Sequence, residues 1–329
     1  MPLAPVARVL ALSVAALALA GCGAPAATPA TTTTPEAPPT VTVTDNVGEH
    51  TITVPPASVV ATDNRLFETL SDWGVQLAAA PRDLIPTTIA YRDDESVVNL
   101  GSHNEPNLEA VVAVEPDLII NGQRFAQYGE DFARLVPDAT VLTLDPRDGE
   151  PLDEELKRGV GVIGQVFDKE AEAQQLSDDL DAAIARAEAA YDPSMTVMAV
   201  NVSGGNIGYI APVAGRTLGP VFDILGLTPA LEIEGATDDH QGDDISVEAI
   251  AASNPGLILV LDRDAAVAAD DASYQPASQV LEGSEALANV TAITEGNVVY
   301  LPNDTYTNEG IQTYTEFFNT LADQLESRP

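Results

Sequence analysis

The sequence contains two copies of one short pattern. Residues 107–120, Asn-Leu-Glu-Ala-Val-Val-Ala-Val-Glu-Pro-Asp-Leu-Ile-Ile, align without a gap with residues 246–259, Ser-Val-Glu-Ala-Ile-Ala-Ala-Ser-Asn-Pro-Gly-Leu-Ile-Leu, 139 positions later. Each copy predicts a short helix, a turn that contains proline and a buried strand. A repeated unit of this kind indicates that the chain folds into two similarly built lobes.

Strand and helix patterns alternate around both copies of this repeat. The alternation predicts an α/β fold, in which each lobe has a mostly parallel sheet flanked by helices. Between the copies, residues 152–191 keep apolar residues at helical spacing and show no strand pattern. A helix of this length would extend about 60 Å at 1.5 Å per residue. We therefore expect one long rigid helix at 151–191 to join a first lobe at 41–150 to a second lobe at 192–329.

The chain is strongly acidic, so the places where arginine recurs need a reason. It has 51 acidic and 14 basic residues and a net charge of −37, which disfavours nucleic acid as a partner. Arg124 lies four residues after the first copy of the repeat, and Arg263 lies four after the second. Ligands of open α/β sheets bind outside the carboxyl ends of the strands. We expect both arginines to face one cleft; pairing with local acids is the alternative.

Two further arginines have a similar context. Arg216 follows Gly215 and begins a predicted helix, whose N-terminus already favours an anion. Arg65 begins an earlier predicted helix and is its approximate counterpart in the first lobe. Both are candidate ligand-binding residues.

A histidine and a tyrosine in polar loops are candidate iron ligands. His240 lies in Asp-Asp-His-Gln-Gly-Asp-Asp, and Tyr306 lies in Pro-Asn-Asp-Thr-Tyr-Thr-Asn. Imidazole and phenolate groups can complete the coordination of a ferric ion whose chelator leaves positions open. The alternatives are a surface histidine and a tyrosine packed on the closing helix.

The sequence offers no catalytic signature. It lacks HExxH, CxxC, Walker, GxGxxG and nucleophile-elbow motifs, and no nucleophile–base–orienter set is evident. We therefore expect a binding protein and not an enzyme. Bare metal binding through His103, His240 and carboxylates stays open as an alternative.

The first 40 residues indicate export and anchoring. An apolar run of about a dozen residues, typical of a secretory signal, ends in Leu-Ala-Gly-Cys at Cys22. This stretch resembles a bacterial lipobox, which implies cleavage after residue 21 and lipidation of Cys22, the only cysteine. An ordinary signal peptide is the alternative. Residues 23–40 are rich in Ala, Pro and Thr and indicate a disordered tether.

The ordered set of features resembles the helical-backbone, two-lobe binding proteins of ABC importers for iron siderophores, haem and cobalamin. The residues that carry the resemblance are Glu-Pro-Asp-Leu-Ile-Ile at 115–120, the long central helix, and the stretch from Asn254 to Arg263. Within that family the chain is most similar to the catecholate-siderophore lipoproteins, the enterobactin and petrobactin type.

The resemblance implies a function and roles for the candidate residues. Arg124, Arg216 and Arg263 match by context the arginines that neutralise a ferric catecholate in the family. His240 and Tyr306 match its iron-coordinating histidine and tyrosine, although the family's aromatic cluster is reduced here to one tyrosine. The family docks on its permease through an acidic residue on each lobe, for which Glu130 and Glu232 are candidates.

These features together predict a monomeric, lipid-anchored protein on the extracytoplasmic face of a bacterial membrane. It would carry a ferric siderophore as ligand, with no intrinsic cofactor, to an ABC permease and its ATPase. Haem, cobalamin and a bare metal ion are the alternative ligands.

Overall fold

The computed structural model describes residues 37–101 and 105–328, and the chain from Pro38 onward forms one compact unit. It begins with an antiparallel hairpin of β1 (Thr40–Thr44) and β2 (Glu49–Thr53). No helix in these two ranges is both long and apolar enough to cross a membrane.

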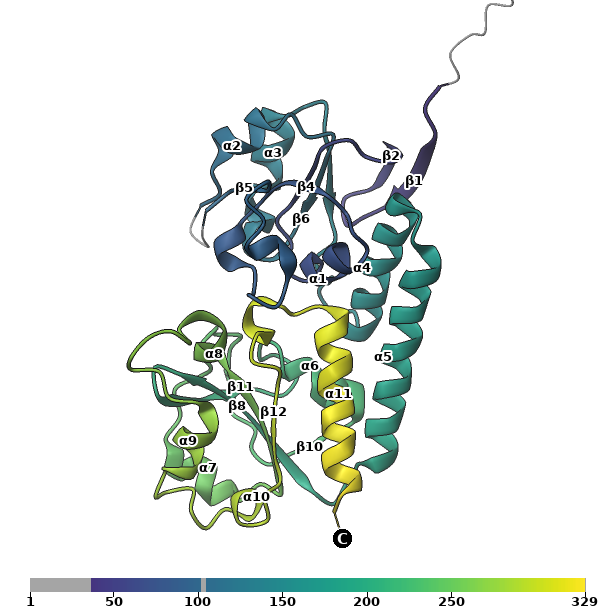
Figure 1. The fold of residues 1–329 in the computed structure, drawn as a ribbon. Helices are drawn as coiled ribbons and strands as arrows, with labels where there is room; N and C mark the ends of the chain where they lie inside the picture. The colour runs from purple at the N-terminus through teal and green to yellow at the C-terminus, as the bar shows by residue number, and fades with distance from the viewer. Residues whose placement is uncertain (1–36, 102–104, 329) are drawn as a thin grey trace, which may run out of the picture. The chain divides into compact units, whose positions relative to one another are not determined.

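The first lobe is built on a wholly parallel sheet in the order β5-β4-β3-β6-β7 (Figure 1). Its elements, in chain order, are β3 (Val59–Ala61), α1 (Phe67–Asp72), β4 (Leu77–Ala80), β5 (Val98–Asn99), α2 (Leu108–Ala113), β6 (Leu118–Asn121), α3 (Gly129–Leu135) and β7 (Thr140–Thr143), with short 3₁₀ turns η1 (Arg82–Leu84), η2 (Ala90–Arg92) and η3 (Gln123–Tyr128).

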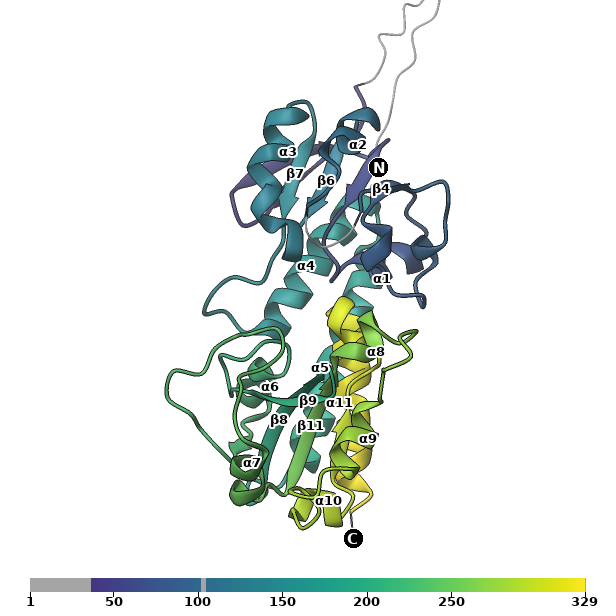
Figure 2. The ribbon, with the colours of Figure 1, turned by 90° about the vertical axis from the view of Figure 1, so that its left-hand side faces the viewer.

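The second lobe repeats this plan with parallel strands β10-β8-β11-β12 (Figure 1), and β9 pairs antiparallel with β8 (Figure 2). Its elements are β8 (Thr196–Ser203), β9 (Asn206–Ile210), α6 (Gly219–Leu225), β10 (Thr228–Pro229), α7 (Val247–Ser253), β11 (Leu257–Asp262), α8 (Arg263–Val267), α9 (Ala277–Glu282), α10 (Thr291–Thr294), β12 (Val298–Tyr300), η4 (Thr305–Thr307) and α11 (Ile311–Glu326).

The two copies of the sequence repeat form the same local structure. Asn107 caps α2 by accepting from the Ala110 N–H, and Ser246 caps α7 by accepting from the Ala249 N–H. Both helices are followed by a residue with a φ of 45°, Glu115 in one copy and Asn254 in the other. The strands that follow, β6 and β11, are each paired on both sides. The predicted two-lobe α/β architecture is confirmed.

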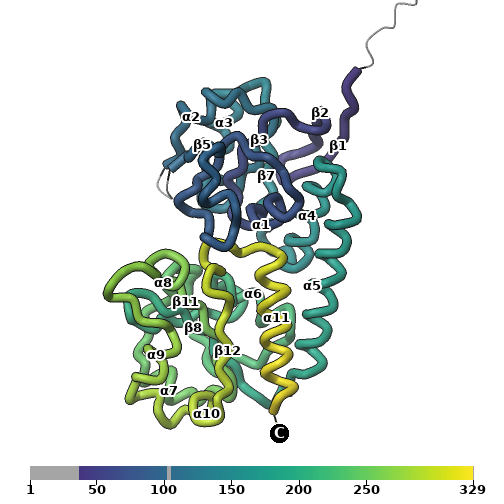
Figure 3. Tube along the Cα trace, in the orientation of Figure 1, coloured from purple at the N-terminus to yellow at the C-terminus, as the bar shows by residue number. Residues whose placement is uncertain are grey.

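The expected single helix between the lobes is wrong. Residues 151–191 form two helices, α4 (Leu152–Phe167) and α5 (Glu170–Ala190), which fold back on each other (Figure 3). Asp168 adopts the left-handed conformation at the corner, with φ of 56°. An added Cβ at Gly164 would lie 2.8 Å from the Ala173 Cβ, so the glycine permits the close approach. Helical spacing is the same for one long helix and for two that fold back.

The helices α5 and α11 join the lobes. They pack along each other, and one buried apolar cluster runs from first-lobe strands through both helices to second-lobe strands. Phe317, Phe318 and Leu180 belong to this cluster and are at most 1% exposed. The loops at the carboxyl ends of both sheets are thus held at one junction.

Candidate functional site

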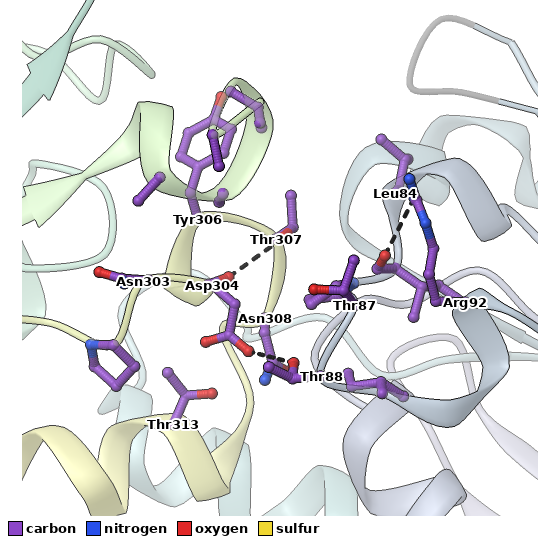
Figure 4. A pocket seen from close by; sticks show the side chains of 18 of the residues that line it. Leu84, Thr87, Thr88, Arg92, Asn303, Asp304, Tyr306, Thr307, Asn308 and Thr313 are labelled. Atoms are coloured by element: carbon purple, nitrogen blue, oxygen red, sulfur yellow. Dashed lines mark hydrogen bonds between the residues drawn. The ribbon is translucent and has the colours of Figure 1, made fainter. Parts of the chain in front are cut away.

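A cavity of about 1190 Å³ lies between the two lobes. First-lobe residues from 83 to 92 line one side, and residues from α8 and the 302–308 loop line the other. Figure 4 shows Leu84, Thr87 and Thr88 on the first-lobe side, with Tyr306 and Thr307 on the second-lobe side. This is the region outside the strand ends where the sequence predicts a ligand.

Three guanidinium groups surround the ring of Tyr306. The Cζ atoms of Arg124, Arg216 and Arg263 lie 5.1, 4.9 and 4.9 Å from the ring centroid, within the range of cation–π attraction. Arg124 follows β6 in the first lobe, Arg263 follows β11 in the second, and Arg216 lies in the loop before α6. The predicted convergence of arginines from both lobes is confirmed, while their role toward a ligand stays a prediction.

Tyr306 is the centre of this group and is 2% exposed. Burial opposes ionisation of its phenol, but hydrogen bonds with Arg124 and Arg263 and the charges of Arg124 and Arg216 outweigh it and lower the pKa below its ordinary value of 10. These arginines make the phenol easier to ionise than that of a free tyrosine, and the phenolate is the form in which a tyrosine oxygen binds a ferric ion. Whether it coordinates iron stays a prediction.

The arginines differ in how their charge is compensated. Arg216 forms an ion pair with Glu309, with 2.9 Å between Nη2 and Oε2, and is not among the residues that line the cavity. Arg263 lies 3.3 Å from an Asp264 oxygen and lines the cavity. Arg124 lines it too, and within the described ranges no carboxylate lies at ion-pair distance from it. The uncompensated positive charge is concentrated on Arg124.

The rest of the cavity is acidic. Carboxylates reach it from both lobes and from α11, namely Glu68, Asp72, Asp83, Asp270, Asp271, Asp304 and Glu316. Burial raises the pKa of Glu68, and the charges of Asp72, Asp304 and Glu316 raise it further, although a hydrogen bond from Asn308 lowers it. The positive charge around Tyr306 is therefore local, within walls of the opposite sign.

His240 also lines the cavity, from the loop before α7. Its side chain is 52% exposed and its Nδ1 lies 3.7 Å from an Asp239 oxygen. The backbone of the loop is held by the Asn201 side chain, which donates to the His240 carbonyl at 3.0 Å. The histidine is thus accessible from the cavity, and its contact with iron stays a prediction.

The structure does not bring Arg65 into the cavity. Its guanidinium lies 3.1 Å from Asp145 and 3.8 Å from Asp63, and none of the three residues lines the cavity. Two carboxylates of its own lobe bind Arg65, and its role toward a ligand stays a prediction. Arg65 precedes α1 much as Arg216 precedes α6, but this similar position does not reveal which carboxylates pair with Arg65.

Glu309 is a buried residue of the site that the sequence did not indicate. It lies in the short loop before α11, which begins at Ile311. Its side chain is 6% exposed and contacts Arg216, Thr217 and Gln123. The sequence feature that could have identified Glu309 is its position, directly before an apolar helix and three residues after Tyr306.

Other predicted residues lie away from the cavity or outside the described ranges. Glu130 in α3 and Glu232 in the loop after β10 are exposed, as docking residues must be, and their role stays a prediction. Cys22 and His103 lie outside the described residues. Within residues 37–101 and 105–328, no group of three His, Cys, Asp or Glu side chains could hold a metal ion.

Comparisons with known proteins agree with this architecture. The petrobactin-binding protein YclQ of Bacillus subtilis is 27% identical over 298 residues, which are 87% of this chain and 88% of that protein. The ferric-anguibactin-binding protein FatB of Vibrio anguillarum is 29% identical over 232 residues, 68% of this chain and 69% of that one.

A solved structure extends this similarity to three dimensions. A TroA-like periplasmic binding protein of Xylanimonas cellulosilytica superposes with a TM-score of 0.72 at 28% identity, covering 88% of this chain and 99% of that one. The family model described as periplasmic binding protein matches residues 59–305. The chain belongs to the periplasmic binding protein family, whose members bind substrates outside the cytoplasm.

Proposed function

We propose that this protein captures a ferric siderophore of the catecholate type and delivers it to an ABC importer for iron uptake. The observation that carries the proposal is the convergence of Arg124, Arg216 and Arg263 on Tyr306 at one side of an interlobe cavity. Guanidinium groups give charge-assisted hydrogen bonds to catecholate oxygens and stack on aromatic rings. A local cationic site is what an anionic chelate needs in a protein with a net charge of −37.

The relatives support the same class of ligand. One is named for petrobactin and the other for ferric anguibactin. In our proposal Tyr306 and His240 face the ferric ion when its chelator leaves positions open, because both line the cavity. Binding and release then leave the covalent bonds of the chelator unchanged, and the protein acts as a carrier and not as an enzyme.

The proposal extends to location and partners. Cys22 is the site of lipid attachment, which holds the monomeric protein on the extracytoplasmic face of the membrane. Two acyl chains are needed for stable anchoring. Glu130 and Glu232 are exposed on different lobes and would contact the permease.

A titration tests the proposed ligand class. The only tryptophan, Trp73, follows Ser71 and Asp72, which line the cavity, so its fluorescence reports on ligand entry. We expect a ferric catecholate complex to bind at micromolar concentration or tighter, and a neutral ferric trihydroxamate to bind at least about tenfold more weakly, a difference of about 1.4 kcal/mol.

Variants of the arginines test the site. R124Q and R263Q should each weaken binding of the catecholate complex by about tenfold or more, since each removes a charge-assisted contact. Arg134 is an exposed residue of α3 and pairs with Asp131, so R134Q is the matched control and should bind as the wild type does. Equal affinity for the hydroxamate, or binding of haem in place of the catecholate, would contradict the proposal.

A further inference from the structure

Glu309 is a buried carboxylate between Tyr306 and α11. Its Oε1 accepts from Arg216 Nε at 3.1 Å and from Thr217 Oγ1 at 2.6 Å. Its Oε2 accepts from Arg216 Nη2 at 2.9 Å and from Gln123 Nε2 at 3.4 Å. Burial opposes the charge of this group, but Arg216, Arg65 and Thr217 outweigh that effect and lower its pKa. The carboxylate is therefore ionised at neutral pH and each oxygen has two donors.

This carboxylate positions the Arg216 side chain and compensates its charge. A bidentate pair holds a guanidinium in one plane and one orientation, here with its Cζ 4.9 Å from the Tyr306 centroid. The donor from Gln123 comes from the first lobe, and those from Arg216 and Thr217 come from the second. Glu309 thus ties the arginine to the junction of the lobes.

The charges around Tyr306 can be counted. The three guanidinium groups meet two carboxylates, Glu309 on Arg216 and Asp264 on Arg263. Among residues 37–101 and 105–328, Arg124 has no carboxylate at ion-pair distance. The group therefore has about one net positive charge when Tyr306 is neutral, and a ligand of low negative charge matches it best.

We propose that Glu309 is a positioning residue that holds Arg216 against Tyr306 and limits the positive charge of the site, so that the protein favours ferric complexes with about one negative charge over those with about three. A ferric ion held by two catecholates has the lower charge and leaves two coordination positions free, and one held by three has the higher charge and leaves none. This inference rests on the proposed function and names the substrate class within it.

Neutralising Glu309 and Arg216, singly and together, tests the inference. The probes are the ferric complexes of a synthetic tetradentate bis-catecholamide and a hexadentate tris-catecholamide, and the measured quantity is the ratio of their dissociation constants. We expect the wild type to favour the bis complex. E309Q, which keeps the size of the side chain but frees the charge of Arg216, should shift the ratio toward the tris complex by about tenfold or more.

The double variant separates charge from folding. R216Q removes one positive charge and should shift the ratio further toward the bis complex. R216Q/E309Q removes both charges and should return the ratio to the wild-type value, although both ligands then bind more weakly. A purely structural role of Glu309 would weaken both complexes equally in every variant. Should E309Q fail to fold, the comparison of R216Q with R216Q/E309Q gives the same test.

The outcomes distinguish this inference from the proposed function. If the wild type binds neither complex, the proposed function fails and this inference fails with it. If the wild type binds a catecholate complex but the ratio is the same in R216Q and R216Q/E309Q, only the inference about Glu309 is overturned. A wild-type preference for the tris complex would overturn it too.

Discussion

Asp63 shows how a single buried carboxyl group in the junction makes stability depend on pH. It is 1% exposed, and burial raises its pKa from 3.8 to about 6; the charge of Arg65 lowers the pKa and those of Asp145 and Glu309 raise it. Between pH 3.8 and about pH 6, Asp63 keeps its proton in the folded protein but has released it in the unfolded chain. The stabilisation is therefore complete below pH 3.8 and is lost as the pH rises through about 6.

We predict that D63N removes this dependence. Asn can still accept from the Arg65 N–H, which lies 3.0 Å from Asp63 Oδ1, but it does not titrate. The free energy of unfolding of the wild type relative to D63N should fall by about 2 kcal/mol between pH 4 and pH 7. Denaturant unfolding of both proteins across that range measures it. A difference that stays constant, or that grows with pH, would contradict the assignment.

Which residues form the site could be predicted from the sequence only in part. Arg124 and Arg263 were found because they occupy equal offsets from two copies of one pattern, and equal positions in similar folds lead to one cleft. Glu309 and the pairing of Arg65 were not found. Their partners come from distant segments, such as Gln123 for Glu309 and Asp145 for Arg65, and one sequence does not show such contacts.

At the scale of elements, the repeat was the strongest signal and the corner between α4 and α5 was the weakest. The repeat has its own caps, Asn107 and Ser246, next to apolar residues at helical spacing, so local sequence determines each helix. The corner has no proline, and its left-handed residue is Asp168, not glycine. The close packing of Gly164 against α5 helps to fix it, and packing of this kind is not visible in the local sequence pattern.

The corner can be tested by filling it. In G164V the new side chain would meet the Ala173 Cβ and the Lys169 carbonyl, since even a Cβ would lie 2.8 and 3.1 Å from them. We expect a loss of about 2 kcal/mol in the free energy of unfolding. The control is G161A in the same helix, where a Cβ meets nothing within 4 Å, and it should gain up to about 1 kcal/mol. Equal stability of both variants would show that the corner is not tightly packed.

At the scale of the whole described unit, the lobes are tied together more closely than a single joining helix would allow. Side-chain hydrogen bonds cross the junction from Thr88 to Asp304 at 2.7 Å (Figure 4), from Asn308 to Glu68 at 2.7 Å, and from Thr69 to Gln312 at 2.9 Å. These hydrogen bonds act in addition to the apolar cluster that both lobes share through α5 and α11. Large opening would break all of these contacts at once, so the cavity is largely formed before the ligand arrives.

The net charge of −37 sets how an anionic ligand approaches this preformed cavity. Acidic walls, including Asp72 and Glu316, repel it at long range, and it is attracted only near Arg124 and Arg263.

Salt screens the long-range repulsion, since the Debye length falls from about 30 Å at 0.01 M to about 8 Å at 0.15 M. We therefore predict that the association rate constant of a ferric catecholate rises severalfold as the ionic strength increases over this range. Binding that is steered by long-range attraction would instead become slower with salt. Stopped-flow quenching of Trp73 fluorescence measures the association rate constant, and a neutral ferric trihydroxamate is the control. A rate constant that falls with salt would contradict the prediction and show that the arginines dominate the field even at a distance.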